Sequence, residues 1–236
     1  MKISLIIPAY NEEQWIGGCL SHIQKNAPEK FHEIIVIDNA STDKTGEVAA
    51  GFPGVRVVRE DKKGLVQARQ RGYIEAKGDI LAYMDADSHV NPGWYERIER
   101  AFTKRPGLAA ISGPYLYYDA NWLQNLLTYI WYVLAYPLYL ALGYMMTGGN
   151  FAIKRSVLDQ MKGFDTSIEF YGEDTNIARR AHKFGKVLFS ISFIMPTSGR
   201  RLKNQGAIKT GYLYAINFFS EVVRSKPASK VYEDYR

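Results

Sequence analysis

Two aspartates stand one residue apart in "YMDADSHVNPGW" (83–94), directly after an apolar run. Mg²⁺ and Mn²⁺ are hard cations that proteins hold through one or two carboxylates, while substrate oxygens complete the coordination. A cation held by Asp85 and Asp87 would neutralise the negative charge that develops on a leaving diphosphate. The Asp-x-Asp triplet also occurs by chance and aspartate favours turns, so the pair alone leaves a turn and a metal site open.

A second acidic pair, Glu173 and Asp174, opens the segment "GEDTNIARRAHKFG" (172–185). The apolar residues that follow recur at helical spacing, so the pair is predicted to begin a helix. Carboxylates at this position stabilise a helix by capping its N terminus and by interacting with its dipole. A fixed carboxylate can also take the proton from an attacking hydroxyl as a general base. The pattern leaves both interpretations open.

The elements that would position these residues lie in the first hundred residues, which alternate apolar runs with helical patterns. The predicted strands are 3–8, 33–38, 55–59 and 79–85, and the predicted helices are 13–25, 43–50 and 64–77. Alternation of this kind indicates an α/β fold with a mostly parallel sheet and helices on both faces. Ligands bind such sheets beyond the carboxyl ends of the strands, so Asp38, Asp85 and the segment 8–12 are expected at one crevice.

Residues 120–153 contain no Asp, Glu, Lys, Arg or His, and 126–146 are long enough as a helix to cross a bilayer. A single crossing would separate the two acidic pairs, so we expect the segment to stay on one side. Pro137 interrupts helices, which predicts two short helices or a re-entrant hairpin. The seven Trp and Tyr residues of this segment suit the interfacial depth of a membrane. We therefore expect contact with a membrane surface or a lipid acceptor, with a buried helix or an oligomer interface as the alternative.

Charge and cysteine content suggest where the protein works. The net charge is +6, and residues 200–236 supply eight Lys and Arg against three Asp and Glu. With the apolar segment, this basic tail indicates an anionic membrane surface rather than nucleic acid. The single cysteine, Cys19, fits a reducing compartment and is expected in the core. The N-terminal apolar run is too short for a signal peptide, so we expect a cytoplasmic protein peripheral to the membrane.

Six motifs follow one another along the chain. They are "IIPAYNEE" (6–13), "VIDNASTD" (36–43), "ARQRG" (68–72), "MDAD" (84–87), "TGGNFAIKR" (147–155) and "GFDTSIEFYGED" (163–174). Together they resemble family 2 glycosyltransferases, over roughly residues 3–190. The resemblance implies the GT-A fold, a Rossmann-like and mostly parallel sheet flanked by helices, with the apolar segment as a helical part of the acceptor side.

The resemblance also implies a role for individual residues. Those expected to bind the nucleotide sugar are Pro8, Ala9, Tyr10, Glu12, Asp38, Arg69, Asp85, Gly148, Gly149, Asn150 and Arg200. Asp85 and Asp87 would hold the divalent cation, Mg²⁺ or Mn²⁺, with Asp87 as its direct ligand. Asp174 would be the catalytic base, with Glu173 beside it, in a single in-line displacement that inverts the anomeric carbon.

The chain departs from the family pattern in three places. Much of the family has Asp-Asp-Gly-Ser where this chain has "DNAS" (38–41), so the nucleobase is not inferred. No His follows His182 to serve as a further metal ligand. The Gln-x-x-Arg-Trp motif of processive synthases is absent, and "SGRRLKNQG" (198–206) offers Arg200 or Arg201 to the diphosphate instead. Transfer of one sugar is therefore expected, rather than polymerisation.

The resemblance predicts one continuous domain with two halves. Residues 1–110 would bind a UDP- or GDP-sugar, and residues 111–236 would bind a lipid-linked or glycan acceptor and carry the base. Two alternatives stay open. A sugar-nucleotide nucleotidyltransferase would have a Gly-rich basic loop after its first strand, where this chain has "PAYNEE". A non-catalytic membrane-associated scaffold derived from a transferase would keep the fold, and a homo-oligomer through 120–153 is also open.

Overall fold

The computed structural model describes residues 1–229, and nine strands and nine helices occur in that range. The strands are β1 (Ile3–Ala9), β2 (Glu33–Asn39), β3 (Val55–Glu60), β4 (Ile80–Met84), β5 (Leu108–Ser112), β6 (Tyr115–Tyr117), β7 (Asn150–Lys154), β8 (Lys186–Phe189) and β9 (Met195–Thr197). The helices are α1 (Ile16–Asn26), α2 (Thr45–Ala50), α3 (Leu65–Glu75), α4 (Trp94–Lys104), α5 (Trp122–Leu142), α6 (Arg155–Met161), α7 (Glu173–His182), α8 (Arg200–Gln205) and α9 (Ala207–Arg224).

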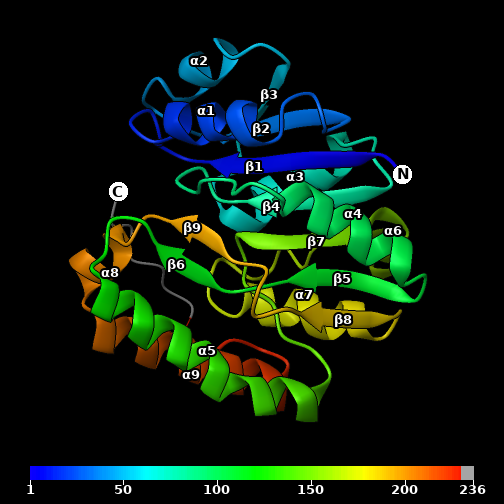
Figure 1. The fold of residues 1–236 in the computed structure, drawn as a ribbon, viewed down its shortest axis with the longest axis vertical. Helices are drawn as coiled ribbons and strands as arrows, with labels where there is room; N and C mark the ends of the chain where they lie inside the picture. Colours follow the sequence, from blue (N-terminus) through cyan, green and yellow to red (C-terminus); the bar gives the residue numbers. More distant parts are fainter. Residues whose placement is uncertain (230–236) are drawn as a thin grey trace.

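Seven strands form one sheet in the order β3-β2-β1-β4-β7-β5-β8 (Figure 1). The first four strands in the chain are parallel, β7 runs antiparallel between β4 and β5, and β8 is parallel to β5. A small parallel sheet pairs β6 with β9. The prediction of a mostly parallel sheet is confirmed, and the four predicted strands lie within one residue of the observed bounds.

Helices cover both faces of the sheet, as predicted. Alternate residues of a strand point to opposite faces, so Leu5 packs under α1, α2 and α4 while Ile6 packs under α3, α6 and α7. Cys19 is fully buried in the first of these two cores, which confirms its predicted place. The two cores fix the sheet rigidly between helices, and the carboxyl ends of β1, β2 and β4 open at one edge, on the left in Figure 1.

The apolar segment forms one helix, α5, so the prediction of two short helices or a re-entrant hairpin is wrong. Asn121 and Gln124 cap its start reciprocally, and Gly143, with φ of 78°, ends it. Pro137 removes one backbone hydrogen bond, to the carbonyl of Val133 four residues earlier. Val133 is exposed, so water can satisfy that carbonyl, and a helix of 21 residues tolerates the loss.

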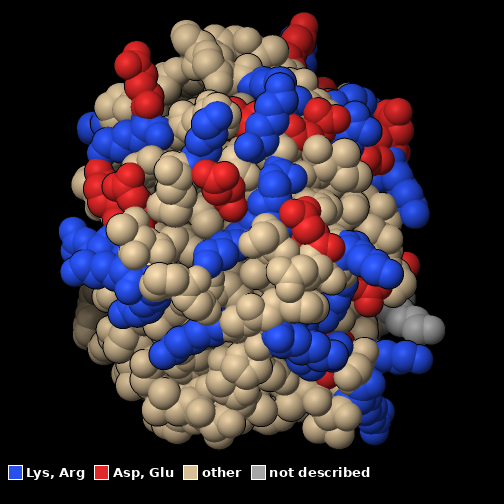
Figure 2. Space-filling view, turned by 90° about the vertical axis from the view of Figure 1, so that its right-hand side faces the viewer, with Lys and Arg blue, Asp and Glu red and all other residues tan. Residues whose placement is uncertain are grey.

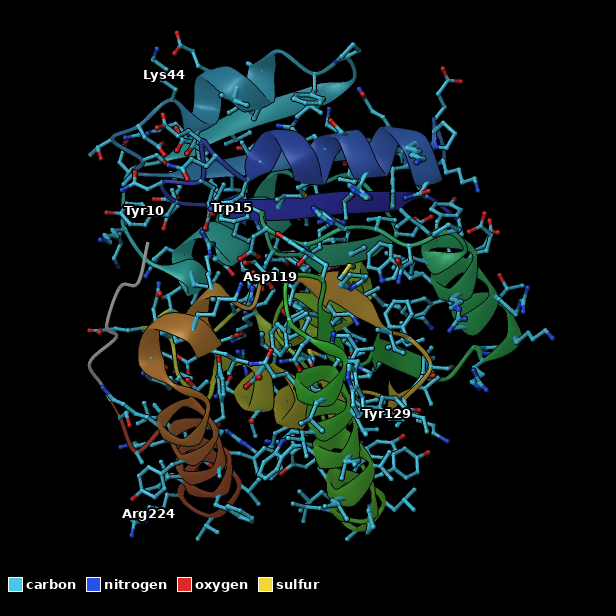
Figure 3. All side chains as sticks on the ribbon, turned by 60° about the vertical axis from the view of Figure 1, so that its left-hand side comes forward. Tyr10, Trp15, Lys44, Asp119, Tyr129 and Arg224 are labelled. Carbon is cyan, nitrogen blue, oxygen red and sulfur yellow. The ribbon has the colours of Figure 1, made fainter. Side chains whose placement is uncertain are left out.

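The helices α5 and α9 project from the same end of the molecule (Figures 1 and 3). Within residues 1–229, α5 is the one helix long and apolar enough to cross a membrane, and almost none of its most apolar part is buried. Figure 2 shows that the lower end of one face is largely tan, with Lys and Arg side chains bordering it. Of the predicted basic tail, residues 200–224 form α8 and α9, while Lys230, Glu233, Asp234 and Arg236 lie outside the described residues.

Candidate active site

The first acidic pair lies at the carboxyl end of β4, beside the glycine loop that precedes β7. Antiparallel pairing places Met84 opposite Asn150, so Asp85 and Gly149 are neighbours. Gly149 has no room for a side chain, because a Cβ there would overlap Asp85 Oδ2 and the hydroxyl of Tyr115. The Tyr115 hydroxyl donates a hydrogen bond of 2.8 Å to Asp85 Oδ2. The glycine loop is therefore packed directly against the Asp-x-Asp motif.

Arg69 of α3 joins the two acidic pairs. Its guanidinium forms an ion pair with Glu173, donates a hydrogen bond of 2.7 Å to the carbonyl of Gly148, and lies 3.9 Å from Asp85 Oδ1. Only 2% of the Arg69 side chain is exposed. Burial raises the pKa of Glu173 to about 7, although the charge of Arg69 opposes that shift. Residues far apart in the sequence thus meet around one buried cation.

Arg200 forms a second charged cluster with Asp87. A nitrogen of Arg200 lies 2.9 Å from Asp87 Oδ2 and 2.5 Å from Glu12 Oε1, and the guanidinium stands 5.5 Å from the ring centre of Trp15. Thr197 of β9 donates a hydrogen bond of 3.2 Å to Asp87 Oδ1. Burial raises the pKa of Asp87 to about 6; Arg200 opposes the shift, and the nearby carboxylates add to it. The cluster holds more acid than base.

Asp174 occupies the first turn of α7, as the sequence predicts for the second pair. Its Oδ1 accepts a hydrogen bond of 2.7 Å from the backbone N–H of Thr175. Asp174 stays partly exposed, whereas Glu173 is buried against Arg69. Burial raises the pKa of Tyr132 on α5 and of Tyr214 on α9, and the charge of Asp174 adds to both shifts. Asp174 is therefore close enough for its charge to act on one tyrosine of each helix that projects from the end of the molecule.

A cavity of about 590 Å³ opens beside the carboxyl ends of β1 and β2. Its lining residues are Pro8, Ala9, Tyr10, Asn39, Lys62, Lys63, Gly64, Leu65, Val66, Gln67, Ala68, Thr166, Ser167, Ile168, Glu169 and Phe170. Lys63 donates a hydrogen bond of 2.8 Å to the hydroxyl of Tyr10. The Asn39 amide holds the loop, because it donates to the carbonyl of Lys62 at 2.8 Å and accepts from the N–H of Gly64 at 2.7 Å.

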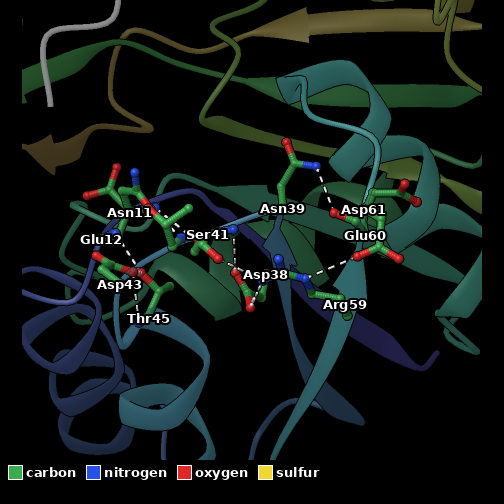
Figure 4. A network of polar contacts seen from close by, with 11 residues as sticks. Asn11, Glu12, Asp38, Asn39, Ser41, Asp43, Thr45, Arg59, Glu60 and Asp61 are labelled. Carbon is green, nitrogen blue, oxygen red and sulfur yellow. Dashed lines mark hydrogen bonds and ion pairs between the residues drawn. The ribbon is translucent and has the colours of Figure 1, made fainter.

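Asp38 is not among the residues that line this cavity and instead takes part in a network of polar contacts (Figure 4). Its Oδ2 lies 2.7 Å from a guanidinium nitrogen of Arg59, and its Oδ1 accepts a hydrogen bond of 3.3 Å from the N–H of Ser41. In the same network the backbone N–H of Glu12 donates a hydrogen bond of 2.7 Å to Thr45 Oγ1. The contacts tie the loop after β1 to the loop after β2.

A family model described as "Glycosyl transferase family 2" matches residues 4–162. The chain belongs to this family. Among curated relatives, Dolichol-phosphate mannosyltransferase of Pyrococcus furiosus is 42% identical over 97 residues, which are 39% of this chain and 27% of that protein. Glycosyltransferase AglE of Haloferax volcanii is 32% identical over 117 residues, 47% of this chain and 36% of that protein. The chain thus spans about a third of the length of these family 2 relatives.

Solved structures share the GT-A fold of this family 2 member. A mannosyltransferase, PcManGT from Pyrobaculum calidifontis in complex with GDP-Man and Mn²⁺, superposes with a TM-score of 0.72 at 20% identity, covering 97% of this chain and 66% of that one. Glucosyl-3-phosphoglycerate synthase from Mycobacterium tuberculosis, with Mn²⁺, UDP-Glc and phosphoglyceric acid, gives 0.66 at 22% identity, covering 97% and 81%. At these identities the likeness shows the fold.

The residues around Asp87 fit a divalent cation that is bound together with phosphate. Among residues 1–229 no three His, Cys, Asp or Glu side chains are grouped to hold a metal by themselves. Asp85 and Asp87 instead supply two carboxylates, the donor set that Mg²⁺ and Mn²⁺ need when phosphate oxygens and water complete the shell. The guanidinium on Asp87 shows that this position accommodates positive charge. In this family 2 member Asp85 and Asp87 would hold the cation.

The structure brings most of the predicted residues to one edge of the sheet, in three groups. The first group is the cluster of Glu12, Asp87 and Arg200. The second group lies around the guanidinium of Arg69 and consists of Asp85, Gly148, Gly149, Glu173 and Asp174. Pro8, Ala9 and Tyr10 line the cavity. Asn150 is fully buried. Its side-chain oxygen accepts a hydrogen bond of 3.0 Å from Trp94 Nε1, and its side-chain nitrogen donates one of 2.7 Å to the carbonyl of Phe193, so these contacts hold the scaffold together.

Four residues of the site were missed by the sequence analysis. Lys62 and Lys63 follow β3, and the rule that ligands bind beyond the carboxyl ends of strands could have found them. Tyr115 and Thr197 come from the small sheet of β6 and β9. No spacing along the chain marks those two, because the pairing that places them joins segments about eighty residues apart.

Above pH 7, where Glu173 is ionised, replacement of Arg69 by glutamine should destabilise the protein by about 3–5 kcal/mol, because the Glu173 carboxylate would be left buried without its cation. Arg71→Gln on the same helix is the matched control, since 40% of the Arg71 side chain is exposed and its pair with Glu75 contributes less than about 1 kcal/mol. Urea unfolding of both variants measures the difference in unfolding free energy. Equal losses in the two variants would contradict the central role of Arg69.

The raised pKa of Glu173 predicts a pH dependence of stability. Between about pH 4.5 and 7 the folded protein retains a proton on Glu173 that the unfolded chain releases. That contribution is complete below pH 4.5 and is lost as the pH rises through about 7. Glu173→Gln should remove the decline, which amounts to up to roughly 3 kcal/mol. Glu75→Gln is the control, because the pKa of Glu75 is lowered. Urea unfolding between about pH 4.5 and 7 measures the unfolding free energy of each variant. If this free energy changes with pH in the same way in wild type and in Glu173→Gln, the predicted pH dependence is refuted.

Proposed function

We propose that this chain is an inverting, metal-dependent glycosyltransferase that moves one sugar from a nucleotide sugar to a hydroxyl of a lipid-linked or otherwise amphiphilic acceptor. The observation that carries the proposal is the meeting of the two acidic pairs around Arg69, beside a cavity at the carboxyl ends of the strands. A leaving diphosphate needs positive charge on one side of the sugar, and an attacking hydroxyl needs a base on the other.

Residues 1–110 form the donor half in this proposal, completed by the segment 166–170 that also lines the cavity. The nucleoside occupies the cavity beside Pro8, Ala9 and Tyr10. The cation would supply charge neutralisation at the diphosphate. Neighbours of this fold were solved with GDP-Man or with UDP-Glc, which supports a GDP- or UDP-sugar donor.

Asp174 accepts the proton of the acceptor hydroxyl in a single displacement at the anomeric carbon. Glu173 is tied to Arg69 and buried, so it positions the start of α7. Asp174 is the member of the pair that keeps an exposed surface, which a group that meets a second substrate requires. A raised pKa makes its carboxylate a stronger base than an exposed aspartate.

Residues 111–236 form the acceptor half and rest on a membrane. Trp122, Leu127 and Leu134 of α5 are among its exposed apolar residues, and such a surface indicates a partner. Both acidic pairs belong to one site, so α5 lies on the bilayer and does not pass through it. A relative named Dolichol-phosphate mannosyltransferase supports a lipid-linked acceptor. We propose a peripheral protein on the cytoplasmic side.

Two variants test the reaction together. In a thermal-shift panel of UDP, GDP, CDP and dTDP with Mn²⁺, wild type should be stabilised by one nucleotide, because a ligand that binds the folded state raises its stability. Asp87→Ala should lose the Mn²⁺-dependent part of that shift. Asp174→Asn should keep the shift and lose transfer of the matching sugar by about 10²–10⁴-fold, since only the base is removed.

The rival functions give other results. A scaffold would show no nucleotide shift in wild type, and Asp174→Asn would change nothing. A nucleotidyltransferase would release diphosphate from a nucleoside triphosphate and a sugar phosphate, and this release would survive Asp174→Asn. Either result would overturn the proposal.

Arg200 competes with the cation for Asp87 and moves to the diphosphate when the donor binds. Arg200→Gln should therefore bind Mn²⁺ alone more tightly, because Asp87 loses the positive charge 2.9 Å away. The same variant should bind the Mn²⁺–nucleotide pair about tenfold more weakly, since one charge-assisted hydrogen bond to phosphate is lost. Calorimetric titration with Mn²⁺, then with nucleotide, separates the two effects. Lys203→Gln is the control, because Lys203 pairs with Asp119. Unchanged Mn²⁺ affinity in Arg200→Gln would exclude the competition.

A further inference from the structure

A second cavity, of about 490 Å³, lies between α4, the end of β8 and α5. It shares no lining residue with the donor cavity. Four basic residues line it, namely Arg97, Arg100, Lys104 and Arg105. Three of them recur along α4 at spacings of three and four residues, which places them on one face of that helix. We call it the α4–α5 cavity.

The lining of the α4–α5 cavity carries positive charge and no negative charge. No Asp or Glu lines it, and among residues 1–229 no carboxylate lies within ion-pair distance of Arg100, Lys104 or Arg105. Glu96 of the same helix forms its ion pair with Lys30, which lowers the pKa of Glu96 more than the charge of Arg100 does. Like charges on one helix face repel one another, so an anion between them would stabilise the arrangement.

An aromatic residue of the cavity lining holds α5 in place. Phe189 lines the cavity and packs against Tyr132 and Tyr139 of α5, with ring centres 5.9 and 6.1 Å from its own. The Tyr139 hydroxyl also donates a hydrogen bond of 3.3 Å to the carbonyl of Val187. Tyr136 of α5 forms part of the cavity wall. The basic face of α4 therefore stands at a fixed distance from the exposed apolar side of α5.

We propose that the α4–α5 cavity binds the phosphate headgroup of an anionic lipid in the bilayer on which α5 rests. This inference depends on the proposed membrane association and names the lipid class that the surface selects. The basic residues match the charge of the headgroup, and the exposed apolar helix beside them matches the acyl chains. A free phosphate would use the charges alone and would leave the neighbouring apolar surface without a partner.

Vesicle sedimentation tests the assignment. Wild type should bind phosphatidylcholine vesicles that contain phosphatidylglycerol more tightly than pure phosphatidylcholine. The double variant Arg100→Gln/Lys104→Gln should bind the anionic vesicles about 30-fold more weakly, because each basic residue near such a surface contributes roughly a fivefold factor. Its binding to neutral vesicles should stay unchanged. The control variant Lys25→Gln/Lys44→Gln removes the same charge from exposed positions on α1 and before α2. Lys44 lies at the end of the molecule opposite α5 (Figure 3). This variant should bind both kinds of vesicle like wild type.

The arms of the experiment separate the ways in which it can fail. If wild type binds neither kind of vesicle, the proposed membrane association itself fails. If Arg100→Gln/Lys104→Gln binds anionic vesicles like wild type, the cavity assignment is wrong and the membrane association stands. A third variant, Arg224→Gln/Lys226→Gln, removes two charges of the basic tail. If only this variant binds anionic vesicles more weakly than wild type, the basic tail and not the cavity binds the anionic lipid. Release of wild type from anionic vesicles by millimolar inorganic phosphate would assign the cavity to free phosphate. The single variant Lys104→Glu should show the same loss and replaces the double variant if that one unfolds.

Discussion

The buried guanidinium of Arg69 is the interaction on which the site depends. Two carboxylates, Glu173 and Asp85, approach one another from α7 and from the end of β4, at the bottom of the site. Their mutual repulsion and their loss of hydration would keep them apart without a cation between them. Arg69 provides that cation from a helix packed on the sheet, and it also fixes the glycine loop through the carbonyl of Gly148. The geometry of both acidic pairs thus follows from one side chain.

The two arginines of the site are held in different ways, and this difference suits different tasks. Arg69 is enclosed, with 2% of its side chain exposed, and α3 is buried along the face that carries it. Arg200 is 20% exposed and belongs to α8, a helix of six residues with no buried residue. Moving Arg69 would disrupt the packing of α3, whereas the proposed movement of Arg200 away from Asp87 would displace only a short helix without a buried residue. The burial of Arg69 suits a fixed part of the site, and the partial exposure of Arg200 suits the proposed exchange with the cation.

Local patterns predicted the four parallel strands and the helices between them, because each strand is a short apolar run and each helix has one buried face. The insertion of β7 between β4 and β5 was not predicted, since an antiparallel strand needs no crossover helix and leaves no such pattern. Tyr115 and Thr197 were missed for a related reason, because tertiary pairing alone brings them to the acidic pairs. The prediction of two short helices failed because it weighed the hydrogen bond lost at Pro137 without considering that the freed carbonyl belongs to an exposed residue, Val133.

The two sides of α5 connect the proposed base to the proposed membrane. Its inner side presents Tyr132, which packs on Phe189 and whose pKa is raised mainly by burial and slightly by the charge of Asp174, and its outer side presents residues such as Trp122 and Leu134. A helix with its side chains is about 10–12 Å across. An acceptor with a polar head and an apolar tail could therefore place its hydroxyl at the base while its tail stays on the outer side. A water-soluble acceptor would have no use for that second surface, so the proposed lipid-linked acceptor accounts for the exposed side of α5 as well as for the position of Asp174.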